Sequence, residues 1–154
     1  MSSKWVGKYF DEFEIGEVFE TPGRTVTEAD LVNFTGVSWD VHPLHNNEEH
    51  CKNTIYGKRI AHGFLILAMM GGLTTCSGIM EKGLGFLGIE EWKFLKPVYP
   101  GETVRCQIKV ISKKAARTGE RGVVTFERQI LNQKNEVVQT GRTVHMFAMS
   151  RGKR

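Results

Sequence analysis

The sequence predicts an α+β fold, in which an antiparallel β-sheet wraps around one buried helix. The segment Phe64–Cys76 is apolar on all sides, which is typical of a helix buried in a core. Four strand-like segments follow it in succession, separated by short turn signals, and this order favours an antiparallel sheet. The chain has 154 residues, a length that suits one domain with one core. We therefore predict a single domain over residues 1–154.

The segments before this helix are predicted to hold a short strand and two shorter helices. The strand precedes Pro22 and Gly23, which form a turn signal. Thr27 is expected to cap a helix whose first turn is acidic, and Gly36 is expected to end it. A second, short helix is expected at residues 47–53, with its cap at the first of them.

The strands after the buried helix are predicted from apolar alternation and from the turns between them. The first of these strands is expected to begin after residues 83–85. Gly71 and Gly72 inside the helix are expected to let it approach the sheet closely. The expected strands are Phe86–Phe94, Thr103–Ser112, Val123–Leu131 and Val137–Met149.

Charge and cysteine content exclude several classes of protein. A net charge of +4 is spread along the chain, and no nucleic-acid-binding signature is present, so we expect no nucleic-acid partner. No apolar run approaches the ~20 residues that span a bilayer, and residues 1–5 lack the apolar core of a signal peptide. Three widely spaced cysteines imply no disulfide framework. We expect a cytoplasmic protein without membrane contact, with a solvated basic end at residues 150–154.

A dense group of titratable side chains lies between the two longer helices. Pro43 has a fixed φ and restricts His42 before it to an extended conformation, so we expect residues 40–45 to form a stiff, extended turn. Asp40 and His45 would then face a shared cleft from its two ends. A carboxylate and an imidazole can together hold one water molecule and move its protons near neutral pH. The simpler alternative is that Asp40 caps a turn, but the paired His45 favours the catalytic role.

A second feature is the glycine at the start of the buried helix. The first turn of a helix leaves backbone N–H groups unpaired, with a positive partial charge. Because Gly63 has no side chain, a carbonyl group can approach these donors, which would stabilise negative charge on its oxygen. His62 is interpreted as a structural histidine that bonds the loop backbone. Lys58 and Arg59 are either solvated loop charges or contacts for phosphates.

His42, His45, His50 and Cys51 are residue types that can bind a metal ion. Their spacing matches no standard zinc arrangement, so we expect no metal. His50 is interpreted as an exposed side chain and Cys51 as a packed thiol.

These motifs resemble those of the MaoC-like and (R)-specific enoyl-CoA hydratases. The family pattern is roughly Gly-Asp-x-Asn-Pro-Leu-His, and residues 39–45 are Trp-Asp-Val-His-Pro-Leu-His. The Arg-Ile-Ala-His-Gly block at residues 59–63 and the segment 97–103 are also family-like. The chain departs from the pattern at Trp39, where Gly is frequent, and at His42, where Asn is frequent.

The resemblance implies a hot-dog fold, a homodimer or dimer of dimers, and an acyl-CoA thioester substrate with no further cofactor. It implies that His45 acts as the base on the water and that Asp40 orients this water and protonates the α-carbon. It also implies that the Gly63 N–H contributes to an oxyanion hole. The residues expected to contact the substrate are Trp39, His42, Lys58, Arg59, His62 and Phe64.

Three functions are then open. The first is a hydro-lyase that reversibly hydrates a trans-2-enoyl-CoA to the (R)-3-hydroxyacyl-CoA. The second is a hot-dog acyl-CoA thioesterase, which needs a carboxylate near the central helix, and Phe64–Cys76 contains none. The third is a non-catalytic acyl-CoA binding module, in which Asp40 or His45 would be expected to be lost. Because both are present, we favour the hydro-lyase.

Overall fold

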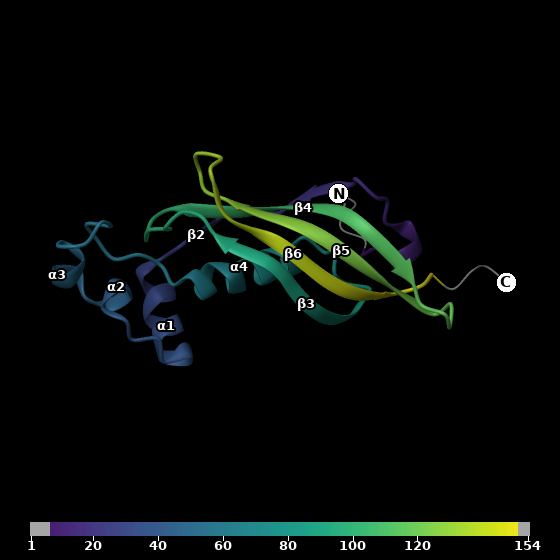
Figure 1. The fold of residues 1–154 in the computed structure, drawn as a ribbon, viewed down its shortest axis with the longest axis horizontal. Coiled ribbons are helices and arrows are strands. Elements are labelled where there is room, and N and C mark those ends of the chain that lie inside the picture. Colours follow the sequence, from purple (N-terminus) through teal and green to yellow (C-terminus); the bar gives the residue numbers. More distant parts are fainter. Residues whose placement is uncertain (1–6, 151–154) are drawn as a thin grey trace, which may run out of the picture.

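The main structural element is an antiparallel sheet that curves over helix α4, as Figure 1 shows for the computed structural model, which describes residues 7–150. The strands lie in the order β1-β4-β5-β6-β3, and β2 also pairs with β4. The predicted α+β class is confirmed. The strands are β1 (Val18–Glu20), β2 (Arg24–Thr25), β3 (Gly83–Phe94), β4 (Thr103–Ala115), β5 (Arg121–Leu131) and β6 (Val137–Ala148).

The four strands predicted after the helix are present, but the first of them begins earlier than expected. Gly83 and Gly85 pair with Phe147 and Met146 of β6, with a register shift between the two glycines. The expectation that this strand begins only after residues 83–85 was therefore wrong. Glycines contribute no side-chain alternation to mark a strand, and their backbone can pair through a bulge.

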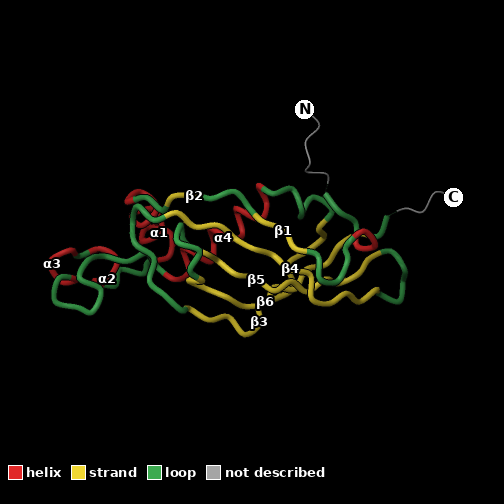
Figure 2. The backbone as a smooth tube through the Cα atoms, turned by 90° about the horizontal axis from the view of Figure 1, so that it is seen from above, coloured by secondary structure: helices red, strands yellow, loops and turns green. Residues whose placement is uncertain are grey.

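The helices divide into one that the sheet covers and three that it does not. Figure 2 shows α1 to α3 gathered near one end of the sheet, whereas α4 lies against the strands. The helical elements are the 3₁₀ turn η1 (Phe10–Glu12), α1 (Glu28–Ser38), α2 (Pro43–Asn46), α3 (Glu48–Cys51) and α4 (Gly63–Cys76).

Helix α4 packs one face on the sheet. Its buried apolar side chains are Leu65, Ile66, Met69, Met70 and Leu73. They belong to one core cluster with the inward side chains of the strands, among them Val104, Cys106, Ile108, Val110, Val124, Phe126, Ile130 and Phe147. Burying one side chain of this size contributes about 1.5–3 kcal/mol. This packing fixes the position of α4, and with it the position of the first turn at Gly63.

The opposite face of α4 is open in the single chain, so the predicted burial on all sides was wrong. Phe64 is 66% exposed, and Ala68, Gly71 and Gly72 are also exposed. A Cβ built on Gly71 or Gly72 meets no atom within 4 Å, so these glycines do not approach the sheet. Among residues 7–150, no other element covers this apolar outer face.

Helix α1 begins as predicted and ends later than predicted. The hydroxyl of Thr27 accepts a hydrogen bond from the Asp30 N–H, and the Asp30 carboxylate accepts one from the Thr27 N–H, which together form a capping box. The helix passes Gly36 and ends at Ser38. It stops there because Trp39 takes the left-handed conformation, with φ 60°.

The two ends of the sequence, residues 1–6 and 151–154, are not described. The residues examined for a signal peptide and most of the basic end therefore lie outside the described part. Between residues 7 and 150, no helix is long and apolar enough to cross a membrane.

Candidate active site

The segment that carries Asp40 and His45 contains a helical turn, where an extended turn was predicted. Pro43 is the first residue of α2, a position that proline favours because its missing N–H is not needed there. The His42 Nδ1 accepts a hydrogen bond from the Leu44 N–H (3.2 Å) and caps this turn. His42, where asparagine is frequent in the family pattern, therefore supplies the N-cap of α2. The helical turn brings His45 back toward Asp40.

One hydrogen bond fixes the orientation of His45. Its Nδ1 lies 2.8 Å from the backbone oxygen of Ile60. A carbonyl oxygen only accepts, so Nδ1 donates and Nε2 is left with its lone pair. The Ile60 N–H in turn donates to the Leu44 oxygen (3.0 Å), which ties α2 to the segment that leads into α4. His45 is therefore held in the tautomer that a general base requires.

The His45 Nε2 and the Asp40 Oδ2 lie 3.9 Å apart. This distance is too long for a direct hydrogen bond, and it suits one water molecule that bonds both groups. The imidazole is largely covered, whereas the carboxylate is 44% exposed. The two predicted catalytic side chains are therefore brought close enough together for one water molecule to bond both.

His62 lies beneath this pair. Its ring is 1% exposed and stacks on His45, with centroids 3.8 Å apart. Its Nε2 lies 3.1 Å from the Asp40 backbone oxygen and 3.2 Å from the Thr35 hydroxyl. Burial, and secondarily His45, lower the pKa of His62, so the ring stays neutral. This agrees with a structural histidine that bonds the loop backbone, and the buried ring lies below the surface at which a substrate would bind.

Gly63 begins α4 at a cavity of about 330 Å³. The first hydrogen bond between α4 and the residue before it runs from the Ile66 N–H to the His62 oxygen (3.3 Å), so the preceding N–H groups lie in the unpaired first turn. The cavity is lined by His45, Tyr56, Ile60, Ala61, Gly63, Ile66, Gln139 and residues 94–98. His45 and Gly63 therefore open onto the same space. Asp40 does not line this cavity and is connected to it through His45, whose Nε2 lies 3.9 Å from the Asp40 carboxylate.

The first turn of α4 is also held by two residues that the sequence did not indicate. The Gln139 Nε2 donates to the Gly63 oxygen (2.9 Å), and the Trp92 Nε1 donates to the Gln139 Oε1 (3.0 Å). Gln139 is buried on β6, on the same sheet face as Thr143 and Phe147. A polar residue in the inward register of a predicted strand was the signal that could have revealed it.

The other residues predicted to contact substrate lie around the site. Trp39 is 85% exposed. The Lys58 ammonium lies over the Tyr99 ring, 4.6 Å from its centroid. Arg59 is paired with Glu28 (2.9 Å) and Glu48 (2.8 Å), so its charge is already compensated. Of these two cations, Lys58 is the better candidate for a phosphate contact.

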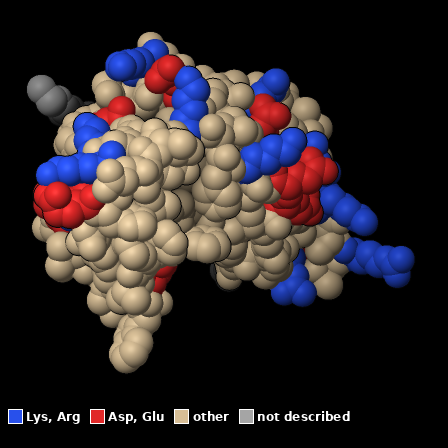
Figure 3. Space-filling model, turned by 60° about the vertical axis from the view of Figure 1, so that its left-hand side comes forward, with Lys and Arg blue, Asp and Glu red and all other residues tan. Residues whose placement is uncertain are grey.

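Phe64 extends the apolar surface next to the cavity, with its ring edge-on to Phe94 at a centroid distance of 6.0 Å. Figure 3 views the molecule with the end that carries α1 to α3 turned forward. A hollow there is surrounded by uncharged surface, and charged side chains lie mainly toward the rim. Such a surface suits a ligand with an apolar body and charged groups at its outer end.

Asp40, His45 and His62 each place one ligand atom within 4.8 Å of the others, a spacing that could hold a metal ion. The two imidazole planes are inclined by only 26°. Lone pairs lie in the ring plane, so stacked rings do not aim them at a common point. The His62 Nε2 is also engaged with backbone and hydroxyl oxygens, whereas its Nδ1 is buried without a partner among the described residues. The arrangement fits proton transfer better than metal binding. Of the set first weighed, His50 is exposed and Cys51 is buried, as interpreted.

Comparison with known proteins agrees with this geometry. Residues 12–133 match the model of the family described as "MaoC like domain". The chain is 35% identical over 101 residues to Protein MaoC of Klebsiella aerogenes, covering 66% of this chain and 30% of that protein. It thus spans less than a third of that relative's length. It is 31% identical over 119 residues to an (R)-specific enoyl-CoA hydratase of Rhodospirillum rubrum, covering 77% of each.

Solved structures show the same architecture. A protein described as the monoamine oxidase regulatory protein of Archaeoglobus fulgidus matches with a TM-score of 0.85 and 33% identity, covering 94% of this chain and 96% of that one. The arrangement of one curved antiparallel sheet around one helix is the hot-dog fold, as the resemblance implied.

Proposed function

Because the chain belongs to the MaoC-like domain family, we propose that it is a hydro-lyase that reversibly adds water to a trans-2-enoyl-CoA, giving the (R)-3-hydroxyacyl-CoA. The observation that carries this proposal is the pairing of Asp40 and His45. The His45 Nδ1 is bonded to the Ile60 oxygen, and its Nε2 faces the Asp40 carboxylate across 3.9 Å. The relative from Rhodospirillum rubrum that is named an (R)-specific enoyl-CoA hydratase supports the reaction class.

The proposed reaction begins with a water molecule between the two side chains. His45 Nε2 takes one proton from this water while the oxygen forms a bond to the β-carbon. The carbon–carbon double bond opens, and its electrons move to the thioester oxygen as an enolate. Asp40 orients the water, and the proton held on His45 Nε2 passes to the Asp40 carboxylate that faces it. Asp40 then delivers this proton to the α-carbon as the enolate collapses, so the hydroxyl and the α-carbon each carry one hydrogen of the water and both side chains return to their starting states.

The enolate oxygen is proposed to lie at the start of α4. Developing negative charge there is stabilised by the unpaired N–H groups of the first turn, beginning with Gly63. Trp92 and Gln139 hold this turn through the Gly63 carbonyl. The donors are therefore in place before the substrate arrives.

The coenzyme A portion is proposed to leave the cavity on the side of Tyr56 and Lys58. Tyr56 lines the cavity, and the Tyr99 hydroxyl donates to the Tyr56 oxygen (3.3 Å). Lys58 lies over the Tyr99 ring. Its ammonium is thus placed to meet a phosphate, while the exposed Trp39 and Phe64 offer apolar surface nearby.

We further propose that the protein works as a cytoplasmic homodimer or dimer of dimers. Strand β3 is an edge of the sheet, and Leu84, Phe86 and Leu87 on it are more than half exposed. An unpaired apolar edge is a site for strand addition, and a two-fold axis would pair β3 with its copy. The same contact would cover the open face of α4.

The experiment that tests the proposed function is a direct assay of both candidate reactions. Crotonyl-CoA is added to the protein, and the loss of enoyl absorbance reports hydration. Butyryl-CoA is added with a thiol reagent, and the release of free coenzyme A reports thioesterase activity. Hydration without thiol release supports the proposal. Thiol release without hydration would instead favour the thioesterase, although α4 carries no carboxylate.

A further inference from the structure

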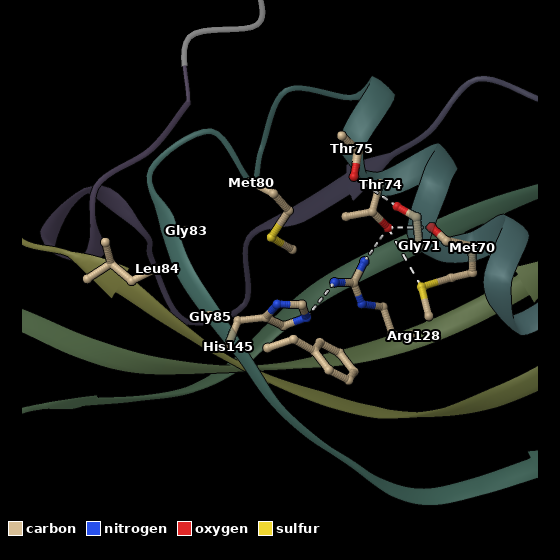
Figure 4. Close-up of a pocket in the computed structure, with 11 residues that line it drawn as sticks. Met70, Gly71, Thr74, Thr75, Met80, Gly83, Leu84, Gly85, Arg128 and His145 are labelled. Atoms are coloured by element: carbon tan, nitrogen blue, oxygen red, sulfur yellow. Dashed lines mark hydrogen bonds between the residues drawn. The ribbon is translucent and has the colours of Figure 1, made fainter.

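A second cavity, of about 490 Å³, lies at the other end of α4, between the helix and the beginning of β3 (Figure 4). Most of its wall is apolar or glycine, and two nitrogen-bearing side chains enter it from the sheet, Arg128 on β5 and His145 on β6. The lining side chains that matter for binding are Met70, Thr74, Met80, Phe86, Arg128 and His145.

Arg128 is a buried cation, 1% exposed. Its Nε donates to the Thr143 hydroxyl (2.8 Å), and its Nη1 donates to the Thr74 hydroxyl (2.9 Å). Its Nη2 lies 3.5 Å from the His145 Nε2. These three contacts use three of the five N–H groups of the guanidinium. The Cys106 thiol and the face of the Phe126 ring, 5.1 Å from Cζ to its centroid, also lie against the guanidinium. The remaining N–H groups of Arg128 are free to donate to a ligand, because this side chain lines the cavity.

The partners of Arg128 carry no negative charge. Hydroxyls are neutral, and burial raises the pKa of the neighbouring Cys106 thiol. Burial and Arg128 lower the pKa of His145 to about 4, so this ring is also neutral near pH 7. Within residues 7–150, the structure pairs no carboxylate with Arg128. Such a charge is unfavourable unless an anion compensates it.

From these observations we propose that the Arg128 cavity binds a carboxylate at the far end of the acyl chain. The enzyme would then prefer an enoyl thioester that carries a second, terminal carboxylate. This inference rests on the proposed hydratase function and deepens it.

The chemistry of the cavity matches such a group. A guanidinium binds a carboxylate through parallel N–H donors. If the His145 Nε2 accepts from Arg128, its Nδ1 carries the ring proton and can donate as well. Met70, Met80 and Phe86 supply apolar walls for the methylene groups before the carboxylate. One uncompensated positive charge matches one carboxylate better than a phosphate, which carries close to two charges.

Helix α4 and strand β3 run in opposite directions, so each cavity lies where one end of the helix meets the opposite end of the strand. Phe94, at the end of β3, lies against Gly63 at the start of α4. Gly83, at the beginning of β3, shares the Arg128 cavity with Thr74 and Thr75, near the end of α4. Because an α-helix rises about 1.5 Å per residue, Gly63 and Thr74 are separated by roughly 16 Å along α4.

Antiparallel pairing of β3 with its copy places the beginning of one strand beside the end of the other. In the proposed dimer, the Arg128 cavity of one protomer would then lie next to the His45 and Gly63 cavity of its partner. Each substrate site would draw on both protomers, with the acyl chain running from one into the other.

The test compares matched pairs of trans-2-enoyl-CoA substrates, four to eight carbons long, that end in either a methyl group or a carboxylate. For at least one length, kcat/KM should be tenfold or more higher for the carboxylate. Arg128→Met should remove this preference while activity on the methyl-ended substrate is kept. Arg128→Lys should retain part of the preference, because it keeps a cation. Arg142→Met is the matched control, since Arg142 pairs with Glu91 on the surface.

Binding is measured separately, with the saturated dicarboxylic and monocarboxylic acyl-CoA thioesters in a calorimeter. Tighter binding of the dicarboxylic compound by the wild type, abolished in Arg128→Met, supports the inference even if no hydration is seen, in which case only the proposed function fails. Hydration with no preference at any length overturns the inference and leaves the proposed function intact. An equal loss on both substrate series in Arg128→Met and Arg128→Lys also overturns it, because Arg128 would then be a structural residue alone.

Discussion

The imidazole of His62 touches both members of the catalytic pair. Its ring stacks on His45 at a centroid distance of 3.8 Å, and its Nε2 lies 3.1 Å from the backbone oxygen of Asp40. One neutral, buried side chain thus sets the ring plane of the proposed base and the position of the residue that carries the carboxylate. His62 is a positioning residue in this arrangement, because it lies below the reacting groups.

Replacing His62 should therefore lower turnover more than substrate binding. His62→Ala removes both the stack and the hydrogen bond, and a displacement of catalytic groups by about 1 Å can cost up to about 10²-fold in rate. His62→Phe retains a stacking ring, and His62→Gln retains a donor, so each should recover part of kcat. Steady-state kinetics with crotonyl-CoA would check this. A rise in KM with unchanged kcat would show that His62 only shapes the binding site.

Asp40→Asn and His45→Ala should each remove most of the hydratase activity and leave the fold intact. Acid–base groups typically contribute 10²–10⁴-fold. The double variant should be hardly slower than the less active of the two single variants, because both side chains act on one water molecule. Circular dichroism provides the folding control. Near wild-type turnover in either single variant would remove that residue from the mechanism.

Gly63→Ala should depress kcat, and the structure supplies the reason. A Cβ at this position would lie 2.8 Å from ring carbons of Phe94, so the ring must move into the cavity where the thioester is proposed to lie. The N–H group itself remains. The second variant Gly63→Ala/Phe94→Leu restores space, and it should recover kcat in part. If Gly63→Ala changes only the affinity for a saturated acyl-CoA, Gly63 is a packing glycine and no more.

A homodimer should have a mass of about 35 kDa, twice the 17.4 kDa of one chain. Light scattering at micromolar concentration would measure it. Leu87→Lys places a charge on the exposed β3 edge, where it should weaken pairing with a second copy. Lys93→Gln on the same strand is the matched control and should leave the mass unchanged. A mass near that of one chain for the wild type would contradict the dimer.

Stability should fall as the pH is lowered from about 6.5 to about 4. The pKa of His145 is lowered to about 4 by burial and by Arg128, so in this window the unfolded chain binds a proton that the folded protein does not. The free energy of unfolding then decreases with falling pH, by at most about 1.4 kcal/mol per pH unit from this group, and by less because the ring is partly exposed. His62, whose pKa burial also lowers, acts in the same direction.

Urea unfolding at pH 7, 5.5 and 4.5 would measure this slope. His145→Asn should flatten it, because the titrating group is gone. Equal slopes for the wild type and the variant would show that His145 does not contribute.

The elements that sequence patterns predicted well are those with strong local signals. Thr27 with Asp30 identified the start of α1, and the apolar run Phe64–Cys76 identified α4. The ends of elements were less predictable. Gly36 was expected to stop α1, but nothing in its neighbourhood forces a turn, and the helix ends instead at Trp39 in the left-handed region, which costs roughly 1–2 kcal/mol for a residue with a side chain.

The catalytic pair was predictable because its residues lie close together in the sequence. The helical turn at α2 was not, because the capping role of His42 depends on the ring nitrogen that faces Leu44. Arg128 was missed because it lies in a strand whose other inward positions, Val124 and Phe126 among them, are apolar. An arginine in that inward register was the available signal, and its meaning depends on neighbours more than ten residues away in the sequence.

The segment from Trp39 to Arg59 buries few side chains against the rest of the molecule, whereas α4 packs a whole face on the sheet. Cys51 is its one buried side chain, and the hydrogen bonds of Leu44 and His45 with Ile60 attach its first half to the rest of the chain. The contacts that keep the protein folded are thus largely separate from those that keep the catalytic pair aligned. Substitutions in this segment can therefore alter the catalytic pair and the proposed coenzyme A contacts with little effect on the packing of the sheet, whereas a change of acyl group would act through Arg128 on the sheet itself.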